Sequence, residues 1–180
     1  MNILHRKSLI LILLTLICFS AWGGELIQRD SKQSIAEFAK SVLPEGAELI
    51  HPVVEVSLKE APNVVVAIYR DKSQATNFSG LVLIPGDKSL EYRKTYLPPM
   101  KEADGIFDIA VKSVFAKKNK SNNNNGLVVL YGYYRLGSGG ESGSAGYFYT
   151  LDDNTWQIDD SLSEKLESVK NAQQAKAKLK

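Results

Sequence analysis

Residues 64–69 read VVVAIY, and residues 127–131 read LVVLY. Both runs are short, apolar and rich in β-branched or aromatic side chains, which is typical of buried strands. Each is followed by a polar loop, a second apolar run (residues 80–84, GLVLI, and residues 146–149, GYFY), an acidic turn and a third run. The sequence therefore predicts two three-strand meanders. Their similarity favours an internal duplication, although such meanders also recur by chance in β proteins.

Further strands are predicted around the two meanders. Residues 49–58 and residues 107–116 alternate apolar and polar side chains, which is the pattern of a half-buried strand. Turn-forming sequences, such as PGD at residues 85–87, separate the successive strands. We therefore predict an antiparallel sheet of six or more strands.

Two capping boxes predict helices at the ends of the strand-rich region. Residues 34–37 read SIAE and residues 161–164 read SLSE, and apolar residues follow each box at helical spacing. Beyond Lys170 the sequence is rich in lysine and alanine, and we expect the second helix to fray there. The predicted fold class is α+β, with an antiparallel β-sheet (two three-strand meanders plus extra strands) flanked by N- and C-terminal α-helices.

The first residues have the features of a cleavable secretory signal peptide. Basic or ionisable residues 5–7 precede the apolar run 9–19, which is shorter than the roughly 20 apolar residues that a membrane span requires. The small residues Ala21 and Gly23 suit a signal peptidase that cuts before Gly24. We therefore expect a periplasmic or secreted protein.

The expected organisation has three parts. They are a signal peptide at residues 1–23, a strand-rich globular domain opened by a short helix at 24–160, and a C-terminal amphipathic helix with a basic tail at 161–180. Cys18 is interpreted as an apolar residue of the signal. A lipidated cysteine is disfavoured because Ile17 occupies a position where lipoprotein signals need a small side chain.

Composition narrows the functional classes. The chain has 22 Lys+Arg and 20 Asp+Glu, and loss of Arg6 and Lys7 with the signal would leave 20 of each. This balance argues against a nucleic-acid partner and against binding to an anionic membrane. Removal of Cys18 would also leave no disulfide, thiol nucleophile or thiolate metal ligand.

The helix, the sequence LPEGA at residues 43–47 and the two meanders resemble exported bacterial proteins with degenerate FG-GAP or VCBS-like repeats. The resemblance covers residues 34–158, and it implies a calcium loop of Asp-x-Asp-x-Asp-Gly type before each meander. The corresponding residues here, KEAPN at 59–63 and KSNNNNG at 120–126, lack those carboxylates. We therefore expect no metal site.

The other candidate reactive residues are interpreted as structural. Asp152 and Asp153 suit a turn, and Asp159 and Asp160 suit a helix N-terminus. His51 is the one histidine beyond the predicted signal, so zinc sites built on several histidines are excluded, and it lies in a predicted strand without a nucleophile elbow. The sequence implies no cofactor.

Aromatic residues gather in the second meander beside the Gly/Ser-rich loop at residues 137–144, which lacks the ending of a phosphate-binding loop. Exposed tyrosines beside an adaptable loop are suited to protein or glycan recognition. Cross-strand aromatic pairs that stabilise the sheet are the commoner alternative. The predicted binding residues are Tyr133, Tyr147, Gly139, Gly140 and Ser142.

These features favour an exported, non-catalytic binding or structural domain that recognises an envelope or extracellular protein or a glycan, in the manner of an inhibitor or immunity protein. No residue is assigned a catalytic role under this hypothesis. The alternative is a hydrolase of cell-envelope glycans, because paired carboxylates that are distant in sequence can converge in space. The candidates for that chemistry are Glu91, Asp104, Asp108 and Glu141.

Overall fold

The computed structural model describes residues 24–59, 61–72, 77–100, 105–118, 125–152 and 155–180. The predicted signal peptide with Cys18 lies outside the described residues, as do Asp104, Asp153 and most of the asparagine-rich loop. Within the described residues, no helix combines the length and the apolar character that crossing a membrane requires.

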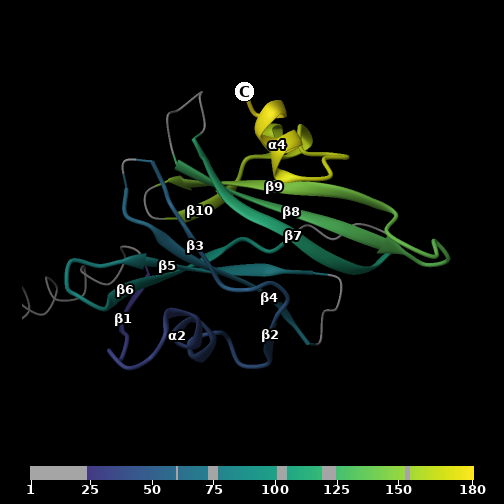
Figure 1. Cartoon of the computed structure of the whole chain (residues 1–180). Helices are drawn as coiled ribbons and strands as arrows, with labels where there is room; N and C mark the ends of the chain where they lie inside the picture. Colours follow the sequence, from purple (N-terminus) through teal and green to yellow (C-terminus); the bar gives the residue numbers. More distant parts are fainter. Residues whose placement is uncertain (1–23, 60, 73–76, 101–104, 119–124, 153–154) are drawn as a thin grey trace, which may run out of the picture.

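The described part of the chain contains ten strands, which form two antiparallel sheets stacked face to face (Figure 1). Sheet A has the order β1-β6-β5-β4-β2, and β3 also pairs with β4. Its strands are β1 (Glu25–Gln28), β2 (Ala47–Leu49), β3 (Val54–Val56), β4 (Val64–Asp71), β5 (Ser79–Pro85) and β6 (Glu91–Leu97). Sheet B has the order β10-β9-β8-β7 and contains β7 (Ile106–Lys118), β8 (Asn125–Arg135), β9 (Gly143–Asp152) and β10 (Thr155–Ile158).

The mostly antiparallel β architecture predicted from the sequence is confirmed. Each predicted meander forms part of a different sheet: β4-β5-β6 lies in sheet A, and β8-β9-β10 lies in sheet B. The prediction of one strand over residues 49–58 is wrong. In that stretch Leu49 ends β2 and residues 54–56 form β3. Both strands pair with β4, and the gap between them contains Pro52, which has no N–H to donate to a ladder.

The main core lies between the two sheets. Alternate residues of β4 and β8, including Val66, Ile68 and Val129, are fully buried there. The intervening residues of the same strands face outward and are also buried, because helices cover the outer face of each sheet. This double coverage explains why both strands read as unbroken apolar runs.

Helix α2 (Ile35–Ser41) covers the outer face of sheet A, where Phe38 and Ala39 pack against Val65 and Leu83. The predicted capping box at Ser34 is confirmed: its hydroxyl accepts from the Glu37 N–H, and the Glu37 side chain accepts from the Ser34 N–H. The elements form four layers in the order helix, sheet, sheet, helix (Figure 1).

The C-terminal segment covers the outer face of sheet B but differs from the prediction. Asp159, rather than Ser161, caps α3 (Asp160–Glu164), because the Asp159 carboxylate accepts from the Leu162 N–H at 3.0 Å. A second helix, α4 (Ala172–Lys178), follows with Asn171 as its N-cap. The expected fraying beyond Lys170 is therefore wrong, since Ala175 and Leu179 are buried against sheet B.

Candidate functional site

The predicted binding residues occupy different parts of sheet B. Tyr133 and Tyr147 are half-buried, and both rings pack against the core between the sheets. Ser142 closes the β8–β9 hairpin, because its N–H donates to the Tyr133 carbonyl and its hydroxyl accepts from the Arg135 N–H, both at 2.9 Å. Gly139 and Gly140 are exposed between these strands, whereas Tyr147 lies further along β9.

A pocket of about 350 Å³ opens beside Tyr147, where the edge of β9 meets the segment that follows β10. We call it the acidic pocket. It combines two tyrosines, two small residues of β9, a serine and three carboxylates. Its lining consists of Tyr131, Ala145, Gly146, Tyr147, Asp160, Ser163, Glu164 and Glu167.

The pocket exists because β10 covers only part of the β9 edge, from Tyr149 to Asp152. Beyond β10 the chain turns along β9 and bonds to the next outward-pointing backbone groups. The Asp159 N–H donates to the Phe148 carbonyl at 2.8 Å, and the Phe148 N–H donates to the Ser163 hydroxyl at 3.0 Å. Further on, the Ser168 N–H donates to the Ser144 carbonyl at 2.8 Å.

Gly146 lies between these two anchored positions. In an antiparallel ladder alternate residues direct their N–H and C=O groups toward the same side, so those of Gly146 point to the same edge as those of Phe148 and Ser144. A side chain at Gly146 would stand 2.5 Å from Leu130 and 3.2 Å from Leu166. Glycine thus lets Leu166 pack closely and leaves a backbone donor and acceptor directed toward the pocket.

Two stacked tyrosines form one wall of the pocket. The ring centroids of Tyr131 and Tyr147 are 5.8 Å apart, the ring planes are 14° from parallel, and the two hydroxyls are hydrogen-bonded. Burial raises the pKa of Tyr131 well above its usual range, and the neighbouring Tyr147 and the negative charge of Glu167 act in the same direction. The Tyr131 hydroxyl in this wall is therefore neutral.

The opposite wall carries the charge. Asp160 and Glu164 are four residues apart on α3, so they share one face of the helix, and Glu167 follows three residues later. All three side chains are exposed, and the described lining contains no lysine or arginine. Within the described residues, no three potential metal ligands lie close enough together to hold one ion. The negative charge is therefore spread around the mouth of the pocket.

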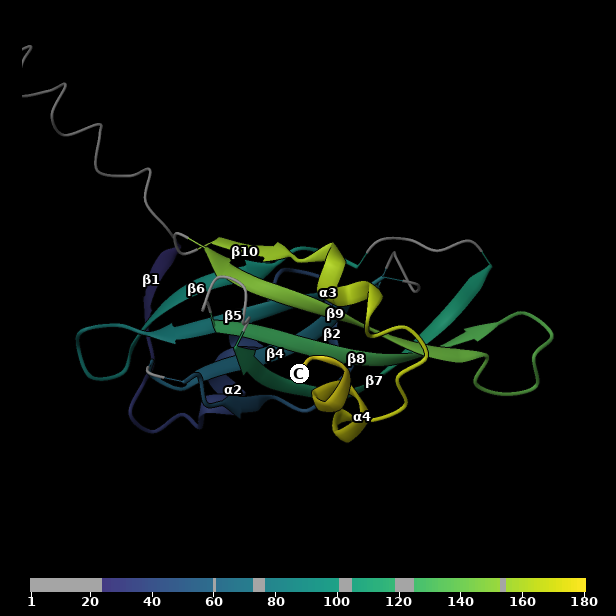
Figure 2. The ribbon, with the colours of Figure 1, turned by 90° about the horizontal axis from the view of Figure 1, so that it is seen from above.

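The candidate hydrolase carboxylates do not form a common site in the described structure. Glu141 pairs with Lys112 at 2.5 Å, and Asp108 lies 3.4 Å from Arg70. Glu91 begins β6 in the β5–β6 hairpin, which lies at the opposite end of the molecule from the β8–β9 hairpin that contains Glu141 (Figures 1 and 2).

A second hollow, of about 510 Å³, lies between α2 and residues 49–53. His51 lines it, and its Nδ1 lies 2.8 Å from the adjacent Pro52 carbonyl. Lys40 lines it from α2, and its other residues are mostly apolar.

Sequence reasoning missed the residues that give the acidic pocket its charge. From the sequence, Asp160 is interpreted as a helix N-terminal residue and Glu164 as part of a capping box, and no role is assigned to Glu167. The available signal was the density of acids after the last strand, where Asp159, Asp160, Glu164 and Glu167 fall within nine residues. Comparison with protein-family models, curated proteins and solved structures found no match to this chain.

Proposed function

We propose that this protein is an exported, non-catalytic recognition domain that binds a lysine or arginine side chain of an envelope or extracellular protein in the acidic pocket. The observation that carries the proposal is the composition of that pocket. Three carboxylates, two hydrogen-bonded tyrosine hydroxyls and an edge of backbone line a space of about 350 Å³. A volume of this size accommodates one side chain or a small ligand.

The charge of the lining favours a cation. Carboxylates and carbonyl groups accept hydrogen bonds. The ammonium group of lysine can donate three hydrogen bonds, and the guanidinium group of arginine can donate five. Carboxylates placed at separate points around the mouth match the spread donors of a guanidinium better than they match a single metal ion. The exposure of Asp160, Glu164 and Glu167 makes binding modest in strength and sensitive to salt.

A glycan fits the same pocket less well. Sugar recognition commonly uses the open face of an aromatic ring, but Tyr147 has Tyr131 stacked on it and Phe78 in edge contact with a centroid separation of 6.4 Å. A neutral sugar would also bring no positive charge to the three carboxylates of the lining. The separate cation partners of Asp108 and Glu141 support the non-catalytic hypothesis over the glycan hydrolase.

The remaining parts of the proposal rest on the sequence. Export follows from the predicted signal peptide at residues 1–23. The resemblance to degenerate FG-GAP or VCBS-like repeats follows from the sequence LPEGA at residues 43–47 and from the two predicted meanders.

The test is a titration of ¹⁵N-labelled protein, residues 24–180, with Nα-acetyl-arginine amide, followed by amide chemical shifts. We expect saturable shifts confined to residues 144–148 and 159–168, with weaker affinity as salt is raised. Nα-acetyl-glutamine amide is the uncharged control and should leave these signals unmoved. Shifts scattered over all acidic surfaces would contradict the proposal. The same localised shifts with a chitin disaccharide, and none with the arginine probe, would transfer the site to glycan recognition.

A further inference from the structure

The equal numbers of acidic and basic residues conceal an uneven distribution over the outer layer of sheet B. The carboxylates of the acidic pocket lie along β9, and α3 contacts that strand. Helix α4 contacts β7 on the other side of the sheet (Figure 2). Lysines gather there, and we call this surface the lysine face: Lys117, Lys170, Lys176, Lys178 and Lys180.

Packing holds α4 in the position that creates the lysine face. Ala175 and Leu179 are buried against Val128, Leu130 and Phe115, so α4 is fixed on the outer face of sheet B and its lysines lie at the rim of this contact. The Lys176 ammonium lies 5.2 Å above the centre of the Phe115 ring. Lys117 follows Phe115 by two residues in β7 and therefore points to the same side.

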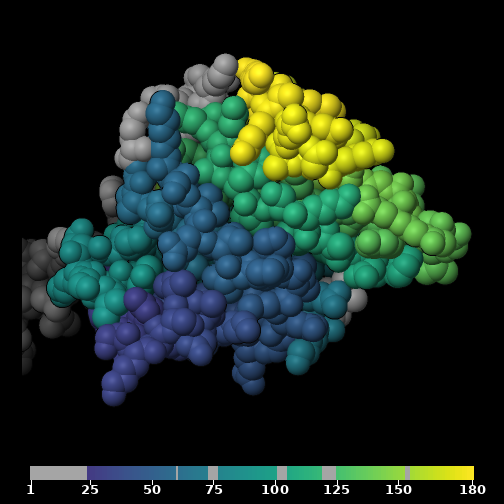
Figure 3. Space-filling model, in the orientation of Figure 1, coloured from purple at the N-terminus to yellow at the C-terminus, as the bar shows by residue number. Residues whose placement is uncertain are grey.

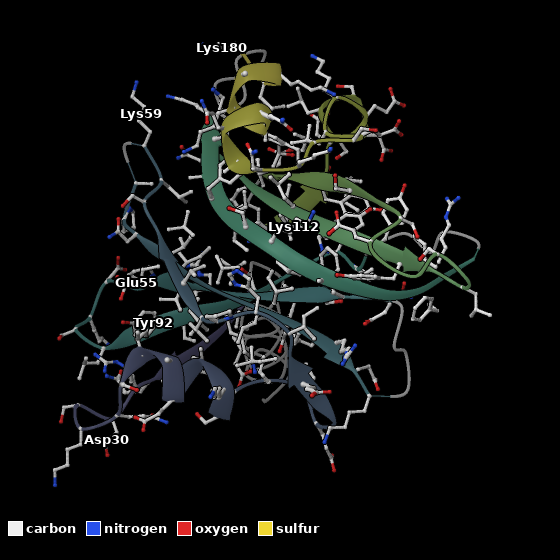
Figure 4. The ribbon with its side chains drawn as sticks, turned by 45° about the vertical axis from the view of Figure 1, so that its right-hand side comes forward. Asp30, Glu55, Lys59, Tyr92, Lys112 and Lys180 are labelled. Atoms are coloured by element: carbon white, nitrogen blue, oxygen red, sulfur yellow. The ribbon has the colours of Figure 1, made fainter. Side chains whose placement is uncertain are left out.

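Few acidic groups interrupt this surface. The Lys178 ammonium donates to the backbone carbonyl of Glu167 at 3.0 Å. Because a carbonyl is uncharged, this contact does not neutralise the positive charge of the lysine. No acid occurs between Lys170 and Lys180. The C-terminal segment forms one end of the molecule in Figure 3, and Figure 4 places Lys59 at the same end as Lys180, far from Asp30.

We propose that the lysine face docks the protein on an anionic lipid surface. Lysine ammonium groups act as point charges toward phosphate headgroups, and clusters of four or more beside a membrane add their attractions. Nucleic acid fits less well, since single strands need open aromatic faces for base stacking, and Phe115 is covered by Lys176. Like-charge repulsion would keep the β9 side away from the lipid, so the acidic pocket stays accessible.

The test is flotation of the protein, residues 24–180, with vesicles of phosphatidylcholine alone or with about 30% phosphatidylglycerol, at about 50 mM and about 500 mM salt. We expect binding only to the phosphatidylglycerol vesicles at low salt. The variant Lys176→Gln, Lys178→Gln, Lys180→Gln should bind at least about tenfold more weakly. The matched control is Lys32→Gln, Lys40→Gln, Lys72→Gln, which removes three exposed lysines outside the lysine face and should bind like the wild type.

Circular dichroism of both variants verifies that each is folded at the flotation temperature. Equal weakening by the two triple variants would overturn the proposal, because net charge rather than the lysine face would then govern binding. Absence of binding to phosphatidylglycerol vesicles would also overturn it. Tighter binding of single-stranded DNA than of vesicles, lost on substitution of the same three lysines, would assign the surface to nucleic acid instead.

Discussion

The indole N–H of Trp156 donates a hydrogen bond to the Thr95 hydroxyl at 3.2 Å, and that hydroxyl donates to the Val82 carbonyl at 3.2 Å. Trp156 belongs to β10 of sheet B, and the other two residues belong to β6 and β5 of sheet A. All three are buried. The bond between Trp156 and Thr95 therefore connects the two sheets. It lies at the β10 edge of sheet B, next to β9, the strand that borders the acidic pocket.

Replacement of Thr95 by valine keeps the shape of the side chain but removes both hydrogen bonds. The buried indole N–H would lose its partner, so we expect the free energy of unfolding to fall by about 1–3 kcal/mol. Urea denaturation measures the change. The control is Thr155→Val, at an exposed position of β10, which should change stability by less than about 0.5 kcal/mol. Equal losses in both variants would mean that the inter-sheet hydrogen bond contributes nothing specific.

The Tyr149 hydroxyl is fully buried and has no hydrogen-bond partner among the described residues. An unsatisfied buried hydroxyl is destabilising, so we expect Tyr149→Phe to raise the free energy of unfolding by about 1 kcal/mol. Tyr147→Phe should have the opposite effect, because the Tyr147 hydroxyl bonds to that of Tyr131. Thermal unfolding of the two variants and of the wild type measures these changes in stability. A loss of stability in Tyr149→Phe would reveal a partner for its hydroxyl.

Alkaline titration tests the burial of the tyrosines. Desolvation raises the pKa of Tyr131 and of Tyr149 far above the usual value near 10. Of the eight tyrosines, at least these two should therefore remain protonated in the folded protein at a pH where the unfolded chain ionises all eight, as measured by ultraviolet absorbance.

The effect on stability follows from this difference. Because the pKa values of the folded state are the higher ones, the unfolded state releases protons first as the pH passes about 10, and the free energy of unfolding falls above that pH. A folded protein in which all eight tyrosines ionise in one transition near pH 10 would contradict the buried placement of these two rings.

The strands could be predicted from the sequence, but the layers could not. Runs such as residues 64–69 indicate strands that are buried on both faces, and the structure has such a strand at β4. The same run does not reveal that Val66 faces the other sheet while Val65 faces α2, because both environments select apolar side chains. One predicted sheet thus became two sheets with a helix layer on each side.

The acidic pocket shows a similar limit. Of the five predicted binding residues, Tyr147 lines the pocket, whereas Tyr133, Gly139, Gly140 and Ser142 do not. The difference arises because the chain turns back along β9 after Ile158, and this brings Asp160, Glu164 and Glu167 to the tyrosines. Local propensity explained Asp159 and Asp160 as helix-starting residues and carried no information about the strand beside them.

The packing of the C-terminal segment provides a further test. The Leu179 side chain is buried with Leu166 and Val169 against sheet B. We expect Leu179→Ala to lower the free energy of unfolding by about 2–3 kcal/mol, and Lys180→Ala, at the exposed neighbour, to leave it within about 0.5 kcal/mol. No change in the leucine variant would mean that the segment beyond Lys170 is frayed, as the sequence alone suggested.

The most direct test of the proposed function compares dissociation constants for Nα-acetyl-arginine amide in two double variants. Glu164→Gln with Glu167→Gln removes two charges from the acidic pocket, and Glu45→Gln with Glu55→Gln removes two exposed charges elsewhere. We expect the pocket variant to bind at least about fivefold more weakly than the wild type at low salt, and the control variant to bind equally well. Equal affinities in all three proteins, or equal weakening in both variants, would contradict recognition of a basic side chain in the acidic pocket.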